Sequence, residues 1–286
     1  MIAKLILAAA LAVTATPSLA APFCGETPRI AQLQREWAEP QGPVMIAAHR
    51  GGHLKAPENS LAAVDEAVAA GTDFIEVDVQ VSADGVPFIM HDRTVARTTN
   101  GTGKLEEMTY AQVRRLRLKG GNTPPPTLIE MLMHTCGKAL VDLDMKTDRF
   151  APVIAVVQAL GMTDQVELFD ANSDILRAAR AIEPGLPVMT RLTDDVKLEG
   201  INAGLAPVRI VHGDPQSLTP EARDAIRAIP ARIWANALGD IDDLMASGSP
   251  KACVALKTLR EQGANAIQTN YPALLREQLA KCGLAG

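Results

Sequence analysis

The chain has 286 residues, of which 47% are hydrophobic and 21% charged, and its formal net charge at pH 7 is −5. This length suits one large α/β domain with a sizeable core. The mildly acidic balance, without a basic stripe to neutralise phosphates, argues against nucleic acid as a partner.

The first residues have the pattern of a secretory signal peptide. A short charged start precedes an almost unbroken apolar run from Leu5 to Val13, and Ser18-Leu19-Ala20 provides a small-x-small cleavage site. The run is shorter than the roughly 20 apolar residues that a spanning helix needs, so we expect no stable membrane anchor. We expect a signal peptide at residues 1–20, a single domain at residues 21–286, and a periplasmic or secreted location.

Short apolar runs rich in β-branched residues recur along the chain and predict nine strands. These are Val44–His49, Phe74–Val79, Val86–Met90, Ala139–Asp144, Val166–Phe169, Pro187–Met189, Arg209–Val211, Arg232–Ala235 and Ala266–Thr269. Helical segments lie between them, which indicates a parallel sheet with right-handed crossovers.

Local signals mark the helix starts between these strands. Ser60 precedes a helix over Leu61–Ala70, and Thr127 opens another with a capping box that Glu130 completes. Three further starts have similar signals, at Thr109, Thr219 and Ser249.

One connection breaks the alternation of strand and helix. Only Ser82–Gly85 separate the second and third strands, too few residues for a crossover helix, so the third strand must return antiparallel. Eight strands of the βα type remain, the number that closes a TIM barrel. The predicted fold is therefore α/β, a TIM-type (β/α)8 barrel with an extra β-hairpin strand after strand 2. The longest loop, residues 92–126, is expected to form a functional rim.

The four cysteines are not spaced as CxxC pairs, which argues against a zinc knuckle. In an oxidising compartment we expect one or two disulfides, and four cysteines allow three full pairings. We favour Cys24 with Cys282, because a closed barrel would bring near-terminal residues together.

Charged residues are predicted at the carboxyl ends of the barrel strands, where the βα loops face a common mouth. Glu76 and Asp78 alternate along one strand, so both carboxylates point to the same face. Asp144 and Lys146 repeat this alternation on the next barrel strand. Such an all-oxygen carboxylate set predicts one bound divalent cation, Ca²⁺ or Mg²⁺, and Lys146 with Arg50 suits a phosphate oxyanion.

Two histidines are predicted at the same mouth. His49 ends the first strand, and a turn centred in Ser82–Gly85 pairs residues whose numbers sum to about 167, which places His91 beside Glu76. Paired histidines supply one base and one acid near neutral pH.

Several motifs occur in a fixed order along the chain. They are Ala48-His49-Arg50-Gly51-Gly52, Ala56-Pro57-Glu58-Asn59-Ser60, Phe74-Ile75-Glu76-Val77-Asp78-Val79, His91-Asp92, Arg97-Thr98-Thr99-Asn100-Gly101, Pro126-Thr127-Leu128-Ile129-Glu130 and Ala264-Asn265-Ala266-Ile267-Gln268-Thr269-Asn270-Tyr271-Pro272. In content, order and spacing this set resembles the glycerophosphodiester phosphodiesterase family. Residues 150–230 resemble it only in the rhythm of their strands.

The resemblance implies hydrolysis of a small-molecule glycerophosphodiester to glycerol 3-phosphate and an alcohol. It implies His49 and His91 as the acid/base pair, and the metal ligands that it implies are Glu76, Asp78 and Asp144. The family usually has Glu where this chain has Asp144, which shortens the reach of that ligand by one methylene.

The resemblance also implies Arg50 and Lys146 as phosphate contacts. Glu58 is expected to support the site, by holding His49 or Arg50, by approaching the metal, or by capping the following helix. Trp234 is either an aromatic wall for the alcohol moiety or a core residue.

Four other residues have weaker assignments. His212 and Asp214 follow a predicted strand and are candidates for the rim of the mouth, His53 is expected to be a surface loop residue, and His134 is expected to be structural.

Two alternative functions stay open. A related barrel phosphodiesterase of the sphingomyelinase D or lysophospholipase D type would act on a lipid. Asp144 as the third metal ligand, in place of the usual Glu, leaves this alternative open. A periplasmic binding barrel without turnover would bind ligand or metal and release no product. The intact pair of His49 and His91 counts against it.

Overall fold

The computed structural model describes residues 23–193 and 204–285, so the predicted signal peptide at residues 1–20 lies outside the described residues. Within them one sheet has the strand order β1-β9-β8-β7-β6-β5-β4-β2-β3, and β1 also pairs with β2. The strands are β1 (Met45–Ala48), β2 (Phe74–Val81), β3 (Pro87–Ile89), β4 (Leu140–Met145), β5 (Val166–Phe169), β6 (Val188–Leu192), β7 (Ile210–Gly213), β8 (Arg232–Asn236) and β9 (Ala266–Thr269). Eight parallel strands thus close a barrel and β3 lies outside the ring, which confirms the predicted fold.

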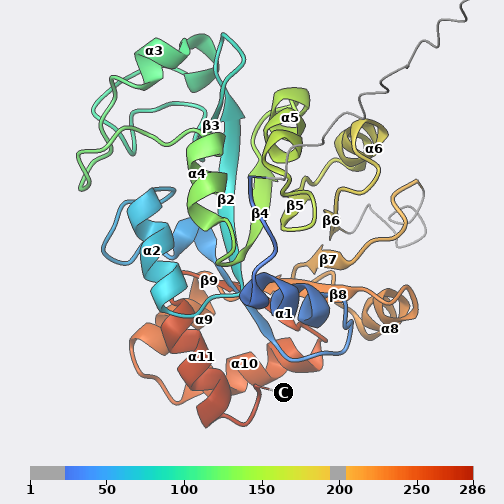
Figure 1. Cartoon of the computed structure of the whole chain (residues 1–286). Coiled ribbons are helices and arrows are strands. Elements are labelled where there is room, and N and C mark those ends of the chain that lie inside the picture. The colour runs from blue at the N-terminus through green and yellow to red at the C-terminus, as the bar shows by residue number, and fades with distance from the viewer. Residues whose placement is uncertain (1–22, 194–203, 286) are drawn as a thin grey trace, which may run out of the picture.

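Helices surround the barrel (Figure 1). They are α1 (Pro28–Trp37), α2 (Leu61–Ala69), α3 (Tyr110–Val113), α4 (Leu128–Thr135), α5 (Ala151–Leu160), α6 (Ser173–Ile182), α8 (Pro220–Ala228), α9 (Asp240–Ala246), α10 (Lys251–Glu261) and α11 (Pro272–Lys281), with the 3₁₀ turns η1 (His49–Gly51) and η2 (Leu105–Glu107). The side chain of Ser60 caps α2, and Thr127 with Glu130 forms the predicted capping box of α4.

The alternation of side chains along the strands divides the core into two layers. Val77 and Leu143 point outward and pack with residues of the surrounding helices. At the amino-terminal end of the barrel, Trp37 of α1 packs edge-on against Phe74 inside the ring, with 5.4 Å between ring centroids. Aromatic side chains therefore fill this end of the barrel, and the polar residues lie toward the carboxyl ends of the strands.

The hairpin between β2 and β3 differs from its expected register by one residue. Val79 pairs with Ile89, so the paired numbers sum to 168 rather than 167. The Ser82 N–H donates to the Val86 carbonyl and encloses a three-residue loop, whose last residue, Gly85, has a φ of 89°. The expected position of His91 beside Glu76 is therefore wrong by one residue, although His91 still reaches the mouth.

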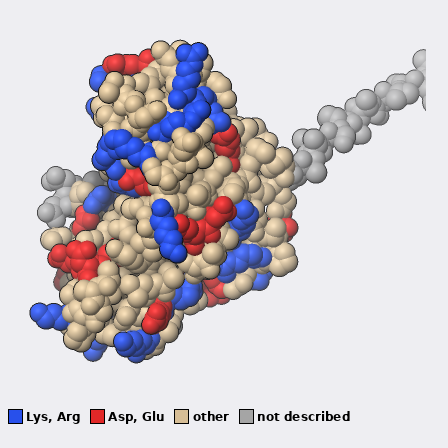
Figure 2. Space-filling model, turned by 90° about the vertical axis from the view of Figure 1, so that its left-hand side faces the viewer, with Lys and Arg blue, Asp and Glu red and all other residues tan. Residues whose placement is uncertain are grey.

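Residues 92–126 form a lobe beside the barrel (Figure 1). Val95, Leu105 and Val113 of the lobe pack with Phe88 of β3 and with Met90 in a small separate core. The sequence of the lobe has seven Lys and Arg against three Asp and Glu, and blue side chains gather over it in Figure 2. This positive excess beside the mouth favours the approach of an anionic substrate.

The disulfides join Cys24 to Cys136 and Cys253 to Cys282, so the expected pair of Cys24 with Cys282 is wrong. The segment before α1 runs along the ends of α4 and α5, where the Cys24 N–H donates to the Leu160 carbonyl. Helix α11 instead packs against α10, which carries Cys253.

Within the described residues no helix is both long and apolar enough to span a bilayer.

Candidate active site

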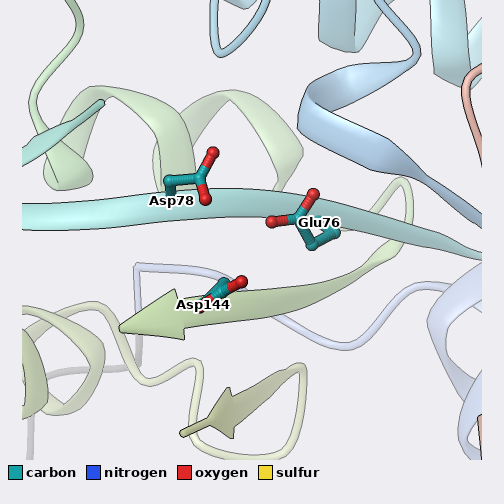
Figure 3. Close-up of side chains that lie close together, drawn as sticks. All are labelled: Glu76, Asp78 and Asp144. Carbon is teal, nitrogen blue, oxygen red and sulfur yellow. The ribbon is translucent and has the colours of Figure 1, made fainter. Parts of the chain in front are cut away.

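Three carboxylates converge at the carboxyl ends of β2 and β4 (Figure 3). One oxygen each of Glu76, Asp78 and Asp144 lies within 4.8 Å of the other two. Asp78 and Asp144 are direct partners in the register of the two parallel strands, and Glu76 precedes Asp78 on the same face. The structure thus brings together the three ligands predicted from the sequence.

The charge of this cluster suits a divalent cation. Burial raises the pKa of Glu76 well above its usual range, and the charges of Asp78 and Asp144 raise it further. Burial also raises the pKa of Asp144, to about 6. Lys146 Nζ lies 2.7 Å from Asp144 Oδ2 and 3.3 Å from Asp78 Oδ1, and offsets only part of the negative charge. A hard cation with oxygen ligands would neutralise the remainder, so the donor set fits Ca²⁺ or Mg²⁺.

Two neighbouring loop residues orient the carboxylates of β2. Asn59 Nδ2 donates to Asp78 Oδ2 at 2.7 Å, and the backbone N–H of Arg50 donates to Glu76 Oε2 at 2.7 Å. Asn59 and Arg50 have φ values of 59° and 48°, which are uncommon outside glycine and occur often at functional sites. This role of Asn59 was not predicted from the sequence. The available signal was an Asn in a tight turn, since Asn tolerates positive φ better than most residues.

His49 is fixed by a residue from the other end of the chain. Its Nδ1 lies 2.8 Å from Oδ1 of Asn270, the residue that follows β9. The same oxygen lies 3.1 Å from Nε2 of His53. The amide oxygen can only accept, so the ring N–H of His49 is assigned to Nδ1 and its Nε2 is left as a proton acceptor. Burial lowers the pKa of His49 to about 4, although the Asn270 hydrogen bond acts in the opposite direction. The imidazole is therefore neutral at pH 7.

A chain of charged side chains connects His91 with Arg50. His91 Nδ1 lies 2.7 Å from Asp92 Oδ1, and Arg97 donates both to Asp92 at 2.6 Å and to Glu58 at 2.7 Å. Glu58 in turn accepts from Arg50 Nη1 at 3.0 Å. Burial raises the pKa of Glu58, but the Arg97 hydrogen bond and the charges of both arginines outweigh it and leave that pKa below its usual value. Of the three roles open for Glu58, the structure shows the one in which it holds Arg50.

A cavity of about 100 Å³ at the barrel mouth is lined by the three carboxylates of the cluster together with His49, His91, Arg50 and Lys146. A larger groove of about 700 Å³ lies beside it and extends to Asp170 and Ile175. His91 and Lys146 line both spaces. A small moiety can thus occupy the cavity while a larger group, attached to it past His91 and Lys146, lies in the groove.

Trp234 occupies the base of the cavity and is only 1% exposed. Its indole packs edge-on against Phe74, with 5.7 Å between ring centroids, inside the inner core layer. The geometry therefore favours the core role over an aromatic wall for the alcohol, because almost no surface of Trp234 is free for contact.

Of the two rim candidates, His212 of β7 and Asp214 just after it, one lines the cavity. His212 does so, whereas Asp214 accepts from Arg191 Nη2 at 2.7 Å, in an ion pair at the edge of the mouth. His53 shares Asn270 with His49, and His134 Nε2 lies 2.7 Å from Asp65 on the surface, in agreement with a structural role.

Comparison with known proteins relates this site to one family. The family described as "Glycerophosphoryl diester phosphodiesterase family" matches residues 49–197, more than half of the chain. The chain belongs to this family. The matched residues include His49, Glu76, Asp78 and Asp144.

Individual members match over different lengths. Glycerophosphodiester phosphodiesterase 1 of Bos taurus is 49% identical over 78 residues, which are 27% of this chain and 24% of that protein. Glycerophosphodiester phosphodiesterase of Caldanaerobacter subterraneus is 43% identical over 157 residues, or 50% of this chain and 65% of that protein. The chain thus spans less than two thirds of the length of both.

A solved structure agrees over most of the barrel. The crystal structure of glycerophosphodiester phosphodiesterase from Agrobacterium tumefaciens has a TM-score of 0.69 and 29% sequence identity, and the match covers 81% of this chain and 98% of that one.

Proposed function

We propose that this protein hydrolyses glycerophosphodiesters to glycerol 3-phosphate and an alcohol, with one divalent cation as cofactor. The observation that carries the proposal is the convergence of three carboxylates, two histidines and two cationic side chains on one mouth in a chain of this family. Each group has a complementary part in the cleavage of a phosphodiester.

Glu76, Asp78 and Asp144 would hold the cation, Ca²⁺ or Mg²⁺. When bound, such a cation supplies positive charge to the phosphoryl oxygens and makes attack on phosphorus easier. Arg50 and Lys146 line the same cavity and stabilise the charge that develops on these oxygens. Glu58 keeps the Arg50 guanidinium in place.

The two histidines have different surroundings, and these support different roles for them. His49 is neutral at pH 7, so its Nε2 accepts the proton of the attacking hydroxyl, from glycerol or from water. Attack by water gives glycerol 3-phosphate directly, whereas attack by glycerol gives a cyclic phosphate that water then opens to glycerol 3-phosphate. His91 lies where the cavity meets the groove, and Asp92 fixes its ring through Nδ1. His91 therefore donates a proton to the oxygen of the alcohol as it leaves into the groove.

We further propose that the enzyme acts in the periplasm or outside the cell. The apolar run of residues 5–13 and the cleavage site that follows support export. Two disulfides also suit an oxidising compartment.

The choice of substrate tests the proposal. Purified enzyme with added metal should hydrolyse aqueous glycerophosphocholine to glycerol 3-phosphate and choline. Its kcat/KM on micellar lysophosphatidylcholine should be at least about 10²-fold lower, because an acyl group on the glycerol cannot enter a cavity of about 100 Å³. Faster release of choline from the lysolipid would favour a phospholipase D type of enzyme, and binding without any product would favour a binding barrel.

A further inference from the structure

Three uncharged polar side chains on successive strands line the cavity and take no part in the chemistry described above. His212 lies on β7, Asn236 on β8 and Gln268 on β9. Asn236 and Gln268 are direct partners in the strand register, and His212 pairs with Trp234, two residues before Asn236. The three residues therefore lie near one level of the barrel and point to its inside.

Two of these side chains have a buried polar atom without a hydrogen-bond partner within the described part of the chain. His212 is 4% exposed and Gln268 is 6% exposed. Nε2 of His212 and Oδ1 of Asn236 are both buried without a partner. The His212 ring packs against Phe169, with 5.4 Å between ring centroids. Since buried polar groups in native proteins are nearly always satisfied, unpartnered groups along a cavity point to a ligand that satisfies them.

Their position in the barrel separates them from the charged half of the site. In the ring of eight strands, β7 lies four strands from β2, and β8 lies four strands from β4. The cavity thus has the carboxylates, Arg50 and Lys146 on one side. On the opposite side the uncharged donors and acceptors lie next to Arg191 of β6, which also lines the cavity and forms an ion pair with Asp214. Burial lowers the pKa of His212 to about 4, so its imidazole is neutral at pH 7 and both donates and accepts.

We propose, on the basis of the function proposed above, that His212, Asn236 and Gln268 bind the free hydroxyl groups of the glycerol moiety and so make the enzyme select glycerol. A cavity of about 100 Å³ is smaller than the about 300–1,000 Å³ of pockets for drug-sized ligands, and suits a small polyol. The alcohol lies on the other side of the phosphate, in the groove past His91 and Lys146.

The experiment measures how the loss of His212 and the loss of a substrate hydroxyl combine. Wild type and His212→Phe are assayed on glycerophosphocholine and on its 1-deoxy and 2-deoxy analogues, which each lack one glycerol hydroxyl. If an analogue is not hydrolysed because the missing hydroxyl is the one that attacks phosphorus, its Ki as a competitive inhibitor takes the place of kcat/KM. On glycerophosphocholine, His212→Phe should lower kcat/KM by about 10–100-fold, the usual scale of a lost buried hydrogen bond. On the analogue without the bound hydroxyl, the same substitution should change kcat/KM by no more than about 2-fold.

Two further variants keep this test interpretable. His212→Gln retains a donor and an acceptor, so it should keep more activity than His212→Phe and serves in its place if the latter does not fold. His134→Phe alters a surface histidine bound to Asp65 and should leave every rate unchanged. Asn236→Leu should repeat the pattern of His212→Phe. It should lower kcat/KM on glycerophosphocholine and have a smaller effect on the analogue that lacks the hydroxyl bound by Asn236.

The outcomes distinguish this subsite from the overall function. An equal loss of kcat/KM on all three substrates would overturn the subsite. So would variants that alter the preference between choline and ethanolamine diesters but leave the preference between glycerophosphocholine and its deoxy analogues unchanged. In both cases wild-type turnover would leave the proposed function intact. Absence of wild-type turnover on all the diesters would contradict the function and, with it, the ligand of the subsite.

Discussion

Replacing His49 or His91 by alanine should lower kcat by about 10²–10⁴-fold, the usual scale of a lost general acid or base. Each ring is held at the edge of the cavity by one hydrogen bond, His49 by Asn270 and His91 by Asp92. Neither residue belongs to the hydrophobic core, so the fold should persist. Turnover at saturating substrate and metal, with circular dichroism as the check on folding, measures both effects. Near-normal turnover in either variant would remove that histidine from the mechanism.

Asn270→Asp is the matched variant for the role of His49. A carboxylate beside Nδ1 favours the imidazolium and so raises the pKa of His49 from about 4. A general base must be unprotonated, and kcat/KM therefore falls as the pH drops through its pKa. We expect the acidic limb of kcat/KM against pH to move to higher pH in Asn270→Asp. An acidic limb at the same pH as in wild type would show that His49 is not the base.

Replacing Asp144 by asparagine should weaken metal binding by more than about 100-fold. Loss of a residue that only hydrogen-bonds to a metal ligand usually costs about 10–100-fold in affinity, and Asp144 is proposed to be a ligand itself. Asp144 faces Glu76 and Asp78 directly, so it contributes both an oxygen ligand and a negative charge (Figure 3). Activity should fall at low metal and recover in part at high metal. Isothermal titration calorimetry with Ca²⁺ and Mg²⁺ measures the affinity.

Asp142→Asn and Asp144→Glu are the controls. Asp142 lies below the cluster, beside Glu167, and burial together with the charge of Glu167 raises its pKa well above the usual value. Burial thus disfavours its charged form, and Asp142 lies outside the three-carboxylate cluster, so asparagine should alter metal affinity much less there. Asp144→Glu restores the longer arm usual in the family and should stay active, with a changed preference between Ca²⁺ and Mg²⁺. Equal affinity in wild type and Asp144→Asn would show that another group completes the site.

The parts of the fold and site that depend on local spacing could be predicted from the sequence. The strands were predictable because apolar runs between helix caps mark them, and the short Ser82–Gly85 connection required a hairpin. Glu76, Asp78 and Asp144 were predictable because alternate residues of parallel strands share a face, and TIM barrels collect such residues at one end.

Contacts between distant segments were not predictable in this way. Asn270 holds His49 from 221 positions away in the sequence, and Arg97 joins Glu58 across 39 positions. No spacing rule relates such pairs, since they depend on how loops of different strands fold over the mouth. The burial of Trp234 depends likewise on α1, whose Trp37 supports Phe74 beneath it.

Phosphorus NMR of the wild-type protein, stripped of metal and mixed with glycerophosphocholine, tests metal-dependent glycerophosphodiester hydrolysis most directly. Ca²⁺, Mg²⁺, Mn²⁺ and Zn²⁺ are added back in separate samples. We expect no hydrolysis by the stripped protein, and the signal of glycerol 3-phosphate to appear after Ca²⁺ or Mg²⁺ is restored. Undiminished hydrolysis by the stripped protein, or a phosphorus-containing end product other than glycerol 3-phosphate, would contradict this function.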